Sequence, residues 1–265
     1  MPSSSIPNTS LIRIIDKTSP YGRVCCAAIL FLFFAGFAHA EKNCIDPSSL
    51  ARSTVSIARY FDGEERNAQP DVIGIQGTGW FQSKDTIVTV EHVAVAMGLS
   101  RETWKHLTVQ NNSGTLSIFA RIRRVIGDSA EKLAVLELQK PVASARIVTA
   151  RVLPLEPEDH LVTIAYPHQE LRSVGGRFVR YATDARLAGA ALLEMYDGDN
   201  RLAIDHGASG APVFDCEGRV AAVVSTVITQ TWHSPLGEMR TSTAWGTPNV
   251  LSVPISALAG FSQVH

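Results

Sequence analysis

The sequence lacks an excess of basic residues. Its 24 Lys and Arg residues stand against 25 Asp and Glu residues, which gives a formal net charge of −1. Proteins that bind nucleic acid through its phosphates need a surplus of positive charge, so nucleic acid is not an expected partner. Only 18% of the residues are charged, 7% are aromatic and 45% are hydrophobic. This composition indicates a globular protein and excludes a disordered, collagen-like or coiled-coil chain.

The sequence also has no apolar run long enough for a stable membrane span. The stretch Val24–Ala38 contains 15 residues, whereas a helix needs about 20 to cross a bilayer. Three basic residues precede it (Arg13, Lys17 and Arg23), and Ala38-His39-Ala40 follows with small residues at the two positions that signal peptidases read. We expect residues 1–40 to be an export signal cut after Ala40, so that the mature protein is periplasmic or extracellular. The alternative is an uncleaved signal anchor.

Cysteines are few. Cys25 and Cys26 lie within the signal, which leaves Cys44 and Cys216 in the mature chain. An exported protein meets oxidising conditions, in which two thiols tend to pair. We therefore expect a Cys44–Cys216 disulfide; the alternative is two unpaired thiols.

Metal-binding patterns are missing as well. No pair among the eight His residues has metal-ligand spacing. The segment Asp197–Asn200 faintly resembles a calcium loop, but Ala208 stands at the twelfth position, where such a loop has Glu. No metal or cofactor is expected.

Short strands separated by turns dominate residues 41–265. Pairs and triplets typical of turns recur along the chain: Asp62-Gly63, Gly77-Thr78-Gly79, Asn112-Ser113-Gly114, Gly175-Gly176, Asp197-Gly198 and Glu217-Gly218. Strands are expected at Asp71–Gln76, Thr86–Val90, Leu107–Val109, Leu133–Leu138, Leu161–Ala165 and Val220–Ile228. Short helices are expected at His92–Met97 and Pro254–Leu258. The pattern predicts an all-β protein with two barrels, roughly 45–153 and 158–250, on either side of a hinge at Leu153–Pro157.

Four segments suggest a chemistry. They read GTGWF at Gly77–Phe81, TVEHV at Thr89–Val93, DSAEKLAVL at Asp128–Leu136 and GASGAP at Gly207–Pro212. Their order and spacing resemble the chymotrypsin-fold (trypsin-like) serine peptidases, in particular the protease domain of the bacterial Deg-like branch. The resemblance covers nearly all of residues 70–258. It implies two antiparallel six-stranded barrels with the active site between them, and a polypeptide substrate.

The resemblance implies that Ser209 is the nucleophile and His92 its general base. A serine nucleophile must project from a tight turn whose own amides point at the developing oxyanion. Gly207 and Ser209 are expected to supply those amides, and Gly210 to leave the far side of the turn open to the substrate. The alternative is a plain turn of small residues between strands.

The third member of the triad is not evident. Direct matching puts Lys132 where the family has its aspartate, and an ammonium cannot accept the imidazole N–H. Asp128 has the right strand parity and is the expected acid. Glu131 has the parity of Glu137, which indicates a solvent-facing position, unless a bulge before Leu133 rotates it inward. A protease with no acid is the third possibility, because the oxyanion hole alone retains part of the catalysis.

The same resemblance predicts the specificity pocket. Ala203 matches the floor of the pocket, and Ser225 and Val227 match one wall. Such a pocket is shallow and apolar and accepts small residues before the cut bond, unless the register slips by one or two residues. The sequence therefore supports two hypotheses: an exported serine endopeptidase, or a catalytically weak or inactive pseudo-protease that binds peptides or proteins.

Overall fold

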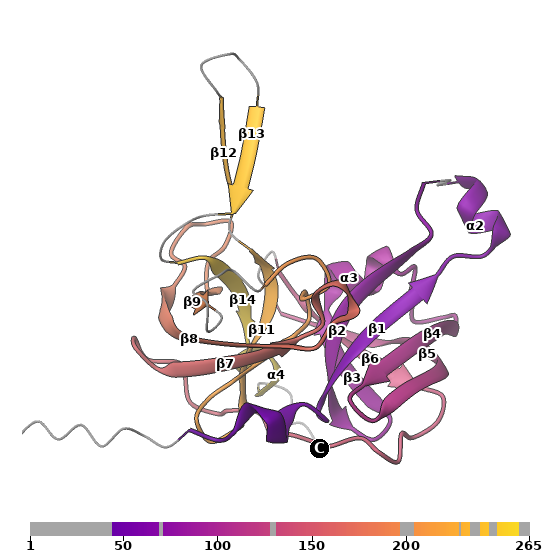
Figure 1. Cartoon of the computed structure of the whole chain (residues 1–265), viewed down its shortest axis with the longest axis horizontal. Coiled ribbons are helices and arrows are strands. Elements are labelled where there is room, and N and C mark those ends of the chain that lie inside the picture. The colour runs from indigo at the N-terminus through magenta and orange to yellow at the C-terminus, as the bar shows by residue number, and fades with distance from the viewer. Residues whose placement is uncertain are drawn as a thin grey trace, which may run out of the picture. The chain divides into compact units, whose positions relative to one another are not determined.

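The structure, a computed structural model, describes residues 44–68, 71–127, 131–196, 204–227, 229–233, 239–243 and 248–259. All of them belong to one compact unit, 43–265. The predicted signal, 1–40, lies outside the described residues. The unit contains two closed six-stranded barrels of antiparallel strands (Figure 1). The predicted all-β fold is confirmed.

The first barrel closes in the order β1-β2-β3-β6-β5-β4. Its strands are β1 (Thr54–Tyr60), β2 (Gly74–Ser83), β3 (Thr86–Val90), β4 (Lys105–Asn111), β5 (Gly114–Ile126) and β6 (Leu133–Leu138). Trp80, Phe81 and Ile87 are among its largest buried side chains. Strand β3 is buried along its whole length, so the residues that follow it are anchored to the core.

The second barrel closes in the order β10-β11-β14-β9-β8-β7. Its strands are β7 (His160–Ala165), β8 (Arg172–Tyr181), β9 (Ala191–Tyr196), β10 (Pro212–Phe214), β11 (Val220–Val227) and β14 (Val250–Pro254). Between β11 and β14, strands β12 (Thr229–His233) and β13 (Met239–Thr243) form a separate two-stranded sheet that projects from the barrel (Figure 1).

The helices are short. They are α2 (Gly63–Ala68), α3 (Glu91–Ala96) and α4 (Ser256–Ala259), with the 3₁₀ turns η1 (Pro47–Leu50) and η2 (Pro167–Gln169). The two short helices expected from the sequence correspond to α3 and α4. In the described part of the chain, no helix is long and apolar enough to span a bilayer.

Two of the predicted turns are wrong. Gly77–Gly79 lies inside β2, and Gly175-Gly176 lies inside β8. At Gly77 and Gly176 the absence of a side chain allows close approach of neighbouring atoms rather than chain reversal. A Cβ on Gly77 would lie 2.5 Å from Val93 Cγ1, and one on Gly176 would lie 2.0 Å from the carbonyl oxygen of Glu194. Both distances are too short for a side chain to fit.

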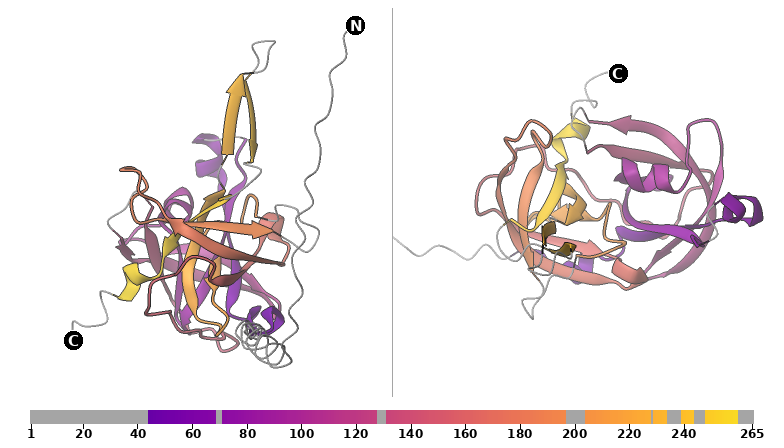
Figure 2. Two further views of the ribbon diagram at one scale, coloured as in Figure 1. Left: turned by 90° about the vertical axis from the view of Figure 1, so that its left-hand side faces the viewer. Right: turned by 90° about the horizontal axis from the view of Figure 1, so that it is seen from above.

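The two barrels share apolar packing along one side. Strands β1 and β7 contact each other, as do β3 and β11, and the barrels lie next to each other when viewed from above (Figure 2). Val220, Val223 and Val253 of the second barrel are buried in the same cluster as the core of the first. This packing fixes the segments that reach the junction from both barrels.

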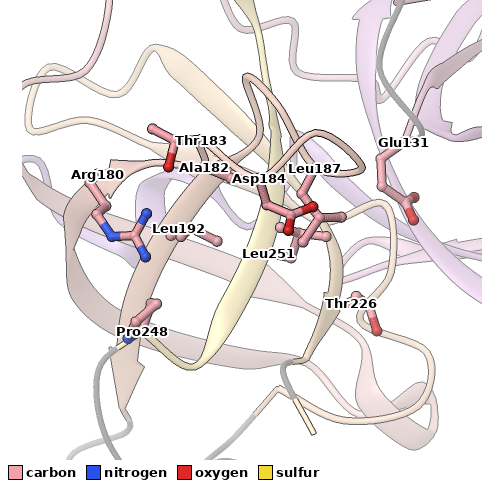
Figure 3. A pocket seen from close by; sticks show the side chains of 10 residues that line it. All are labelled: Glu131, Arg180, Ala182, Thr183, Asp184, Leu187, Leu192, Thr226, Pro248 and Leu251. Carbon is pink, nitrogen blue, oxygen red and sulfur yellow. The ribbon is translucent and has the colours of Figure 1, made fainter.

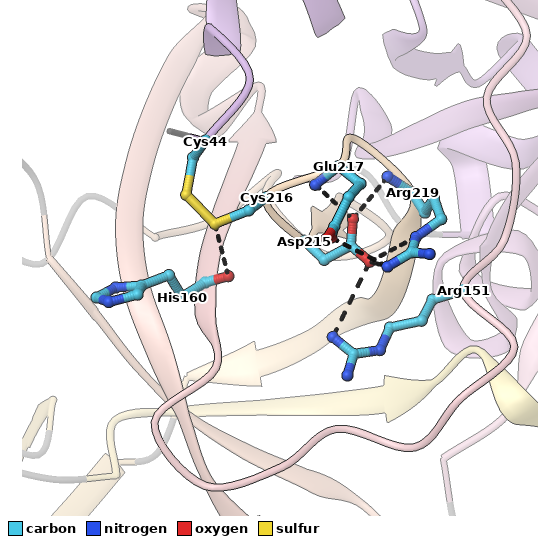
Figure 4. Close-up of a disulfide and its surroundings, with 7 residues drawn as sticks. All are labelled: Cys44, Arg151, His160, Asp215, Cys216, Glu217 and Arg219. Atoms are coloured by element: carbon cyan, nitrogen blue, oxygen red, sulfur yellow. Dashed lines mark hydrogen bonds and ion pairs between the residues drawn. A yellow bond between two sulfur atoms is a disulfide. The ribbon is translucent and has the colours of Figure 1, made fainter. Parts of the chain in front are cut away.

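The predicted disulfide between Cys44 and Cys216 is present (Figure 4). It joins the first described residue to the turn between β10 and β11, across 172 residues of sequence. The Ile45 amide adds a hydrogen bond of 2.9 Å to the Cys216 carbonyl. Next to it the Asp215 side chain, 2% exposed, forms an ion pair with Arg219 at 2.7 Å. The N-terminal segment of the described chain is thus tied to the second barrel.

Candidate active site

His92 is held at the start of α3, directly after the buried strand β3. Val93 and Ala94 of the same helix are buried in the core of the first barrel. The His92 side chain itself is 48% exposed. The local sequence therefore anchors the helix by one face and leaves the imidazole accessible to a substrate.

Glu131 lies opposite His92. Val90 pairs with Leu133 at the end of the antiparallel β3–β6 ladder. Just beyond it, the Glu91 amide donates a hydrogen bond of 2.8 Å to the Lys132 carbonyl. His92 and Glu131 are the next residues beyond this hydrogen bond, in α3 and in the segment before β6. Their side chains meet, with 3.4 Å between His92 Nδ1 and Glu131 Oε2.

The expectation that Glu131 faces solvent is wrong. It assumed strand alternation, but β6 begins at Leu133, so the alternation of strand side chains does not extend to residue 131. Lys132, where the family has its acid, contributes its backbone carbonyl to the ladder. A carboxylate one residue earlier, on the longer Glu side chain, occupies the place beside the imidazole.

Ser225 on β11 supports the Glu131 carboxylate. Its buried hydroxyl donates a hydrogen bond of 2.5 Å to Glu131 Oε2, the same oxygen that contacts His92. The His92 contact holds the pKa of the Glu131 carboxyl below its ordinary value, and the Ser225 hydrogen bond lowers it further, against the effect of burial. The carboxylate is therefore ionised at neutral pH and can stabilise an imidazolium on His92.

Ser209 lies on the turn that precedes β10. Its Oγ donates a hydrogen bond of 2.8 Å to the carbonyl oxygen of Ser225. Ser225 therefore contacts both Ser209, through its backbone, and Glu131, through its side chain. Through these contacts Ser225 connects Ser209 of the second barrel with Glu131, which contacts His92 of the first.

The turn before Ser209 leaves two amides available. The Ala208 amide donates to the Asp205 carbonyl at 2.9 Å, and the Gly210 amide to the Val224 carbonyl at 2.8 Å. Among the residues that the structure describes, none accepts a hydrogen bond from the amides of Gly207 and Ser209. Two such amides on either side of one residue are the arrangement that an oxyanion hole requires.

Gly207 is required at its position. Its φ is +96°, in the left-handed region that favours glycine, and an added Cβ would lie 2.8 Å from the carbonyl oxygen of Tyr166. The expected role of Gly210, an open path for the substrate, is wrong. A Cβ on Gly210 would lie 2.0 Å from the Thr78 carbonyl oxygen and 2.1 Å from Thr89 Oγ1, so this glycine lets the first barrel approach the turn.

The predicted roles of three site residues are not tested. Asp128 and Ala203 lie outside the described residues, so their roles as triad acid and pocket floor stay predictions. Val227 ends β11, where its backbone pairs with Val250. In the described parts of the chain, no group of three or more His, Cys, Asp or Glu side chains is arranged to hold a metal ion.

A cavity of about 490 Å³ opens beside Glu131 and Thr226. Figure 3 shows Leu187, Leu192 and Leu251 between Arg180 on one side and Glu131 on the other. The remaining lining residues are Ala182, Thr183, Asp184 and Pro248. Because Thr226 directly follows Ser225, this apolar cavity adjoins the candidate site. Sequence reasoning missed it, since its walls come from β8, β9, the loop between them and β14.

The sequence matches the model of a known protein family. The model described as a trypsin-like peptidase domain matches residues 77–223, which include His92, Glu131 and Ser209. The chain belongs to the trypsin-like peptidase family. No curated protein matches the sequence significantly.

Solved structures with similar architecture include proteases. The Rv3671c protease from M. tuberculosis in its active form has a TM-score of 0.52 and 14% sequence identity, with 97% of this chain and 92% of that chain covered. Its inactive form has a TM-score of 0.52 and 16% sequence identity, with 80% of this chain and 88% of that chain covered. A serine endoprotease from Yersinia pestis has a TM-score of 0.52 and 15% sequence identity, with 80% of this chain and 62% of that chain covered. At these identities the likeness shows the chymotrypsin fold.

Proposed function

We propose that the protein is an exported serine endopeptidase with a Ser209–His92–Glu131 triad. The observation that supports it most is the Glu131 carboxylate, 3.4 Å from His92 Nδ1, beside a serine turn with two available amides. Glu131 takes the role that sequence reasoning gave to Asp128. A binding module has no physical need for this combination of groups.

The reaction begins with a rotation of the Ser209 side chain from the Ser225 carbonyl toward His92 Nε2. Ser209 Oγ then attacks the carbonyl carbon of the substrate while His92 takes its proton, and the amides of Gly207 and Ser209 stabilise the oxyanion. His92 returns the proton to the leaving amine, which leaves an acyl-enzyme. Water activated by His92 hydrolyses the acyl-enzyme. Glu131 holds the imidazole through Nδ1 and stabilises its charged form.

The pseudo-protease is the second candidate, and one observation favours it. Ser209 Oγ donates to the Ser225 carbonyl, so its proton is directed at that carbonyl oxygen. In this proposal a rotation about the Cα–Cβ bond of Ser209, from one staggered rotamer to another, leads to the reactive arrangement. The peptidase therefore remains the better-supported proposal.

Two sites select the substrate in this proposal. The pocket of Ala203, Ser225 and Val227 accepts a small apolar residue before the cut bond. The cavity lined by Leu187, Leu192 and Leu251 accepts an apolar side chain further from that bond. Leucine side chains around a concave space favour apolar groups because burial removes both surfaces from water.

Export is part of the proposal. The Cys44–Cys216 disulfide supports an oxidising compartment, because disulfides are rare in the reducing cytosol. The signal at residues 1–40 is expected to be cut after Ala40. Recovery of a secreted chain whose N-terminal residue is Glu41 supports this; a cell-associated chain that retains residues 1–40 contradicts it.

The peptidase proposal is tested by digestion of a peptide library with the mature chain, 41–265. We expect products cut after small apolar residues, with none from Ser209→Ala. Ser173→Ala, which changes an exposed serine of β8, is the matched control and is expected to cut as the wild type does. Absence of products from folded wild-type protein contradicts the proposal, and a strong preference for Arg, Lys or Phe contradicts the pocket assignment.

A further inference from the structure

Thr78 of β2 contacts the serine turn through its backbone and its side chain. It is fully buried. Its amide donates a hydrogen bond of 2.8 Å to the Ser209 carbonyl, and its hydroxyl donates one of 2.6 Å to the Gly207 carbonyl. One residue of the first barrel thus holds the backbone of the second barrel at both residues expected to form the oxyanion hole.

The direction of the Thr78 hydroxyl proton is fixed by a third contact. The Tyr166 amide, at the end of β7, lies 3.1 Å from Thr78 Oγ1. An amide can only donate, so Oγ1 accepts there and its single proton is left for the Gly207 carbonyl. The hydroxyl therefore bridges the end of β7 and the serine turn, in one orientation.

Both peptide planes around Gly207 are held in this way. In the peptide plane that follows Gly207, the Gly207 carbonyl accepts a hydrogen bond from the Thr78 hydroxyl. The Ala208 amide of the same plane donates one to the Asp205 carbonyl. The plane that precedes Gly207 is held by the His168 amide, which donates to the His206 carbonyl at 3.1 Å. In a trans peptide the N–H points opposite to the C=O. The Gly207 amide consequently points away from His168 and stays available.

The backbone of Thr78 also limits the other side of the turn. Its carbonyl accepts a hydrogen bond of 2.7 Å from Thr89 Oγ1, and it lies so close to Gly210 that a Cβ there would approach within 2.0 Å. Thr78 is thus in contact with the turn both before and after Ser209. A shift of the turn in either direction would break a hydrogen bond or produce an overlap.

We propose that Thr78 is a positioning residue for catalysis: its hydroxyl sets the Gly207–Ala208 peptide so that the amides of Gly207 and Ser209 face the oxyanion. This inference rests on the proposed peptidase function. Thr78 contacts no reacting atom, and it acts through Gly207. Its loss should therefore weaken stabilisation of the transition state and leave binding of the substrate almost unchanged.

The test compares Thr78→Val, which keeps the shape and removes the hydroxyl, with Thr78→Ser, which keeps the hydroxyl. We expect Thr78→Val to lower kcat by up to about 100-fold with little change in KM, since loss of one oxyanion donor costs about 10²- to 10³-fold. Thr78→Ser is expected to restore kcat to within a few-fold of the wild type. The affinity for a peptide aldehyde, which forms an oxyanion on Ser209, should fall in parallel with kcat.

Thr163→Val is the matched control. Thr163 is also fully buried, and its hydroxyl donates a hydrogen bond of 2.8 Å to the Pro212 carbonyl, beyond the turn. The Thr163→Val variant should lower the midpoint of thermal unfolding about as much as Thr78→Val does, and its kcat should equal that of the wild type. Equal losses of kcat in the two valine variants, or in Thr78→Val and Thr78→Ser, would overturn the inference.

A second readout does not depend on activity. The backbone ¹H and ¹⁵N chemical shifts of Gly207 should change in Thr78→Val and return in Thr78→Ser, while those of Thr163→Val match the wild type. Unchanged Gly207 shifts in Thr78→Val would overturn the inference even if the enzyme is active. If the wild type shows no activity, the proposed function fails, and the Gly207 shifts still decide whether Thr78 sets the turn.

Discussion

The side chains of His92 and Glu131 meet just beyond the end of the β3–β6 ladder, with 3.4 Å between Nδ1 and Oε2. The family's usual acid position is occupied by Lys132, whose carbonyl accepts from the Glu91 amide at 2.8 Å. The backbone pairing that fixes Lys132 therefore also fixes which side chain meets the imidazole. On this account the acid of the triad has moved by one residue, and its longer side chain restores the contact.

Glu131→Gln should abolish most of the activity. Neutralisation of the acid in a well-studied serine protease triad lowers kcat by about 10⁴-fold, and we expect a loss of this order in kcat/KM for a peptide substrate. Glu131→Asp keeps the charge but shortens the side chain by one C–C bond, about 1.5 Å, and should lose activity as well. Lys132→Ala is the control and should remain active. Full activity in Glu131→Gln would exclude Glu131 as the acid.

The stability of the protein should depend on the ionisation of Glu131. Its pKa is lowered in the folded state by the contacts with His92 and Ser225. A lowered folded-state pKa stabilises the fold at pH values above the ordinary Glu pKa of about 4.3, and that contribution disappears as the pH falls through the lowered value. The difference in unfolding free energy between wild type and Glu131→Gln, measured with urea, should therefore shrink between about pH 6 and pH 3. A difference independent of pH contradicts this.

Removal of the disulfide should destabilise the fold without changing the site. Cys44 and Cys216 close a loop across 172 residues, for which the chain-entropy model gives an upper figure of about 5 kcal/mol. The double variant Cys44→Ser/Cys216→Ser should unfold at lower urea concentration and cut substrate normally where it is still folded. Reducing agent should shift the wild type toward the variant and leave the variant unchanged. A double variant as stable as the oxidised wild type would show that the disulfide does not stabilise the fold.

Gly210→Ala should damage both stability and activity. The added Cβ would lie 2.0 Å from the Thr78 carbonyl oxygen, at a φ of +92°. A backbone held in a disfavoured region costs about 1–3 kcal/mol, and the overlap adds to it. Gly175→Ala in β8, where a Cβ meets nothing within 4 Å, is the control. The two variants are compared by urea unfolding and by kcat; equal effects would contradict the close packing of Gly210.

Leu187→Glu should change the substrate preference. Leu187 lines the cavity beside Thr226, and a carboxylate there disfavours apolar groups. We expect kcat/KM to fall about 10-fold or more for peptides with a large apolar residue upstream of the cut bond, as for other changes in apolar pockets. Peptides with alanine at that place should be cut as before. Leu116→Glu, on an exposed position of β5, is the control, and equal losses for both peptides would contradict the assignment.

Features contained in one segment of the sequence, such as the catalytic motifs, could be predicted. Contacts that depend on how two segments pair could not. The motifs around His92 and Ser209 are contiguous, and the resemblance identified them. Strand parity favoured Asp128 over Glu131 as the acid and left Glu131 as an alternative, because the first residue of β6 and its register against β3 cannot be read from either segment alone. Thr78 was interpreted as part of a turn, since its neighbouring glycines resemble turn residues. The real cause is close packing: a Cβ on Gly77 would overlap Val93, and one on Gly79 would overlap Ile87. Such packing between distant segments is a tertiary feature.

The central claim is that Ser209 is a nucleophile activated through His92 and Glu131. It is tested most directly by reaction of the folded mature protein with a fluorophosphonate, followed by mass spectrometry of the labelled peptide. The account predicts covalent labelling of Ser209 in the wild type and in Lys132→Ala, much slower labelling in Glu131→Gln and His92→Ala, and none in Ser209→Ala. Absence of label on Ser209 in the folded wild type would contradict it.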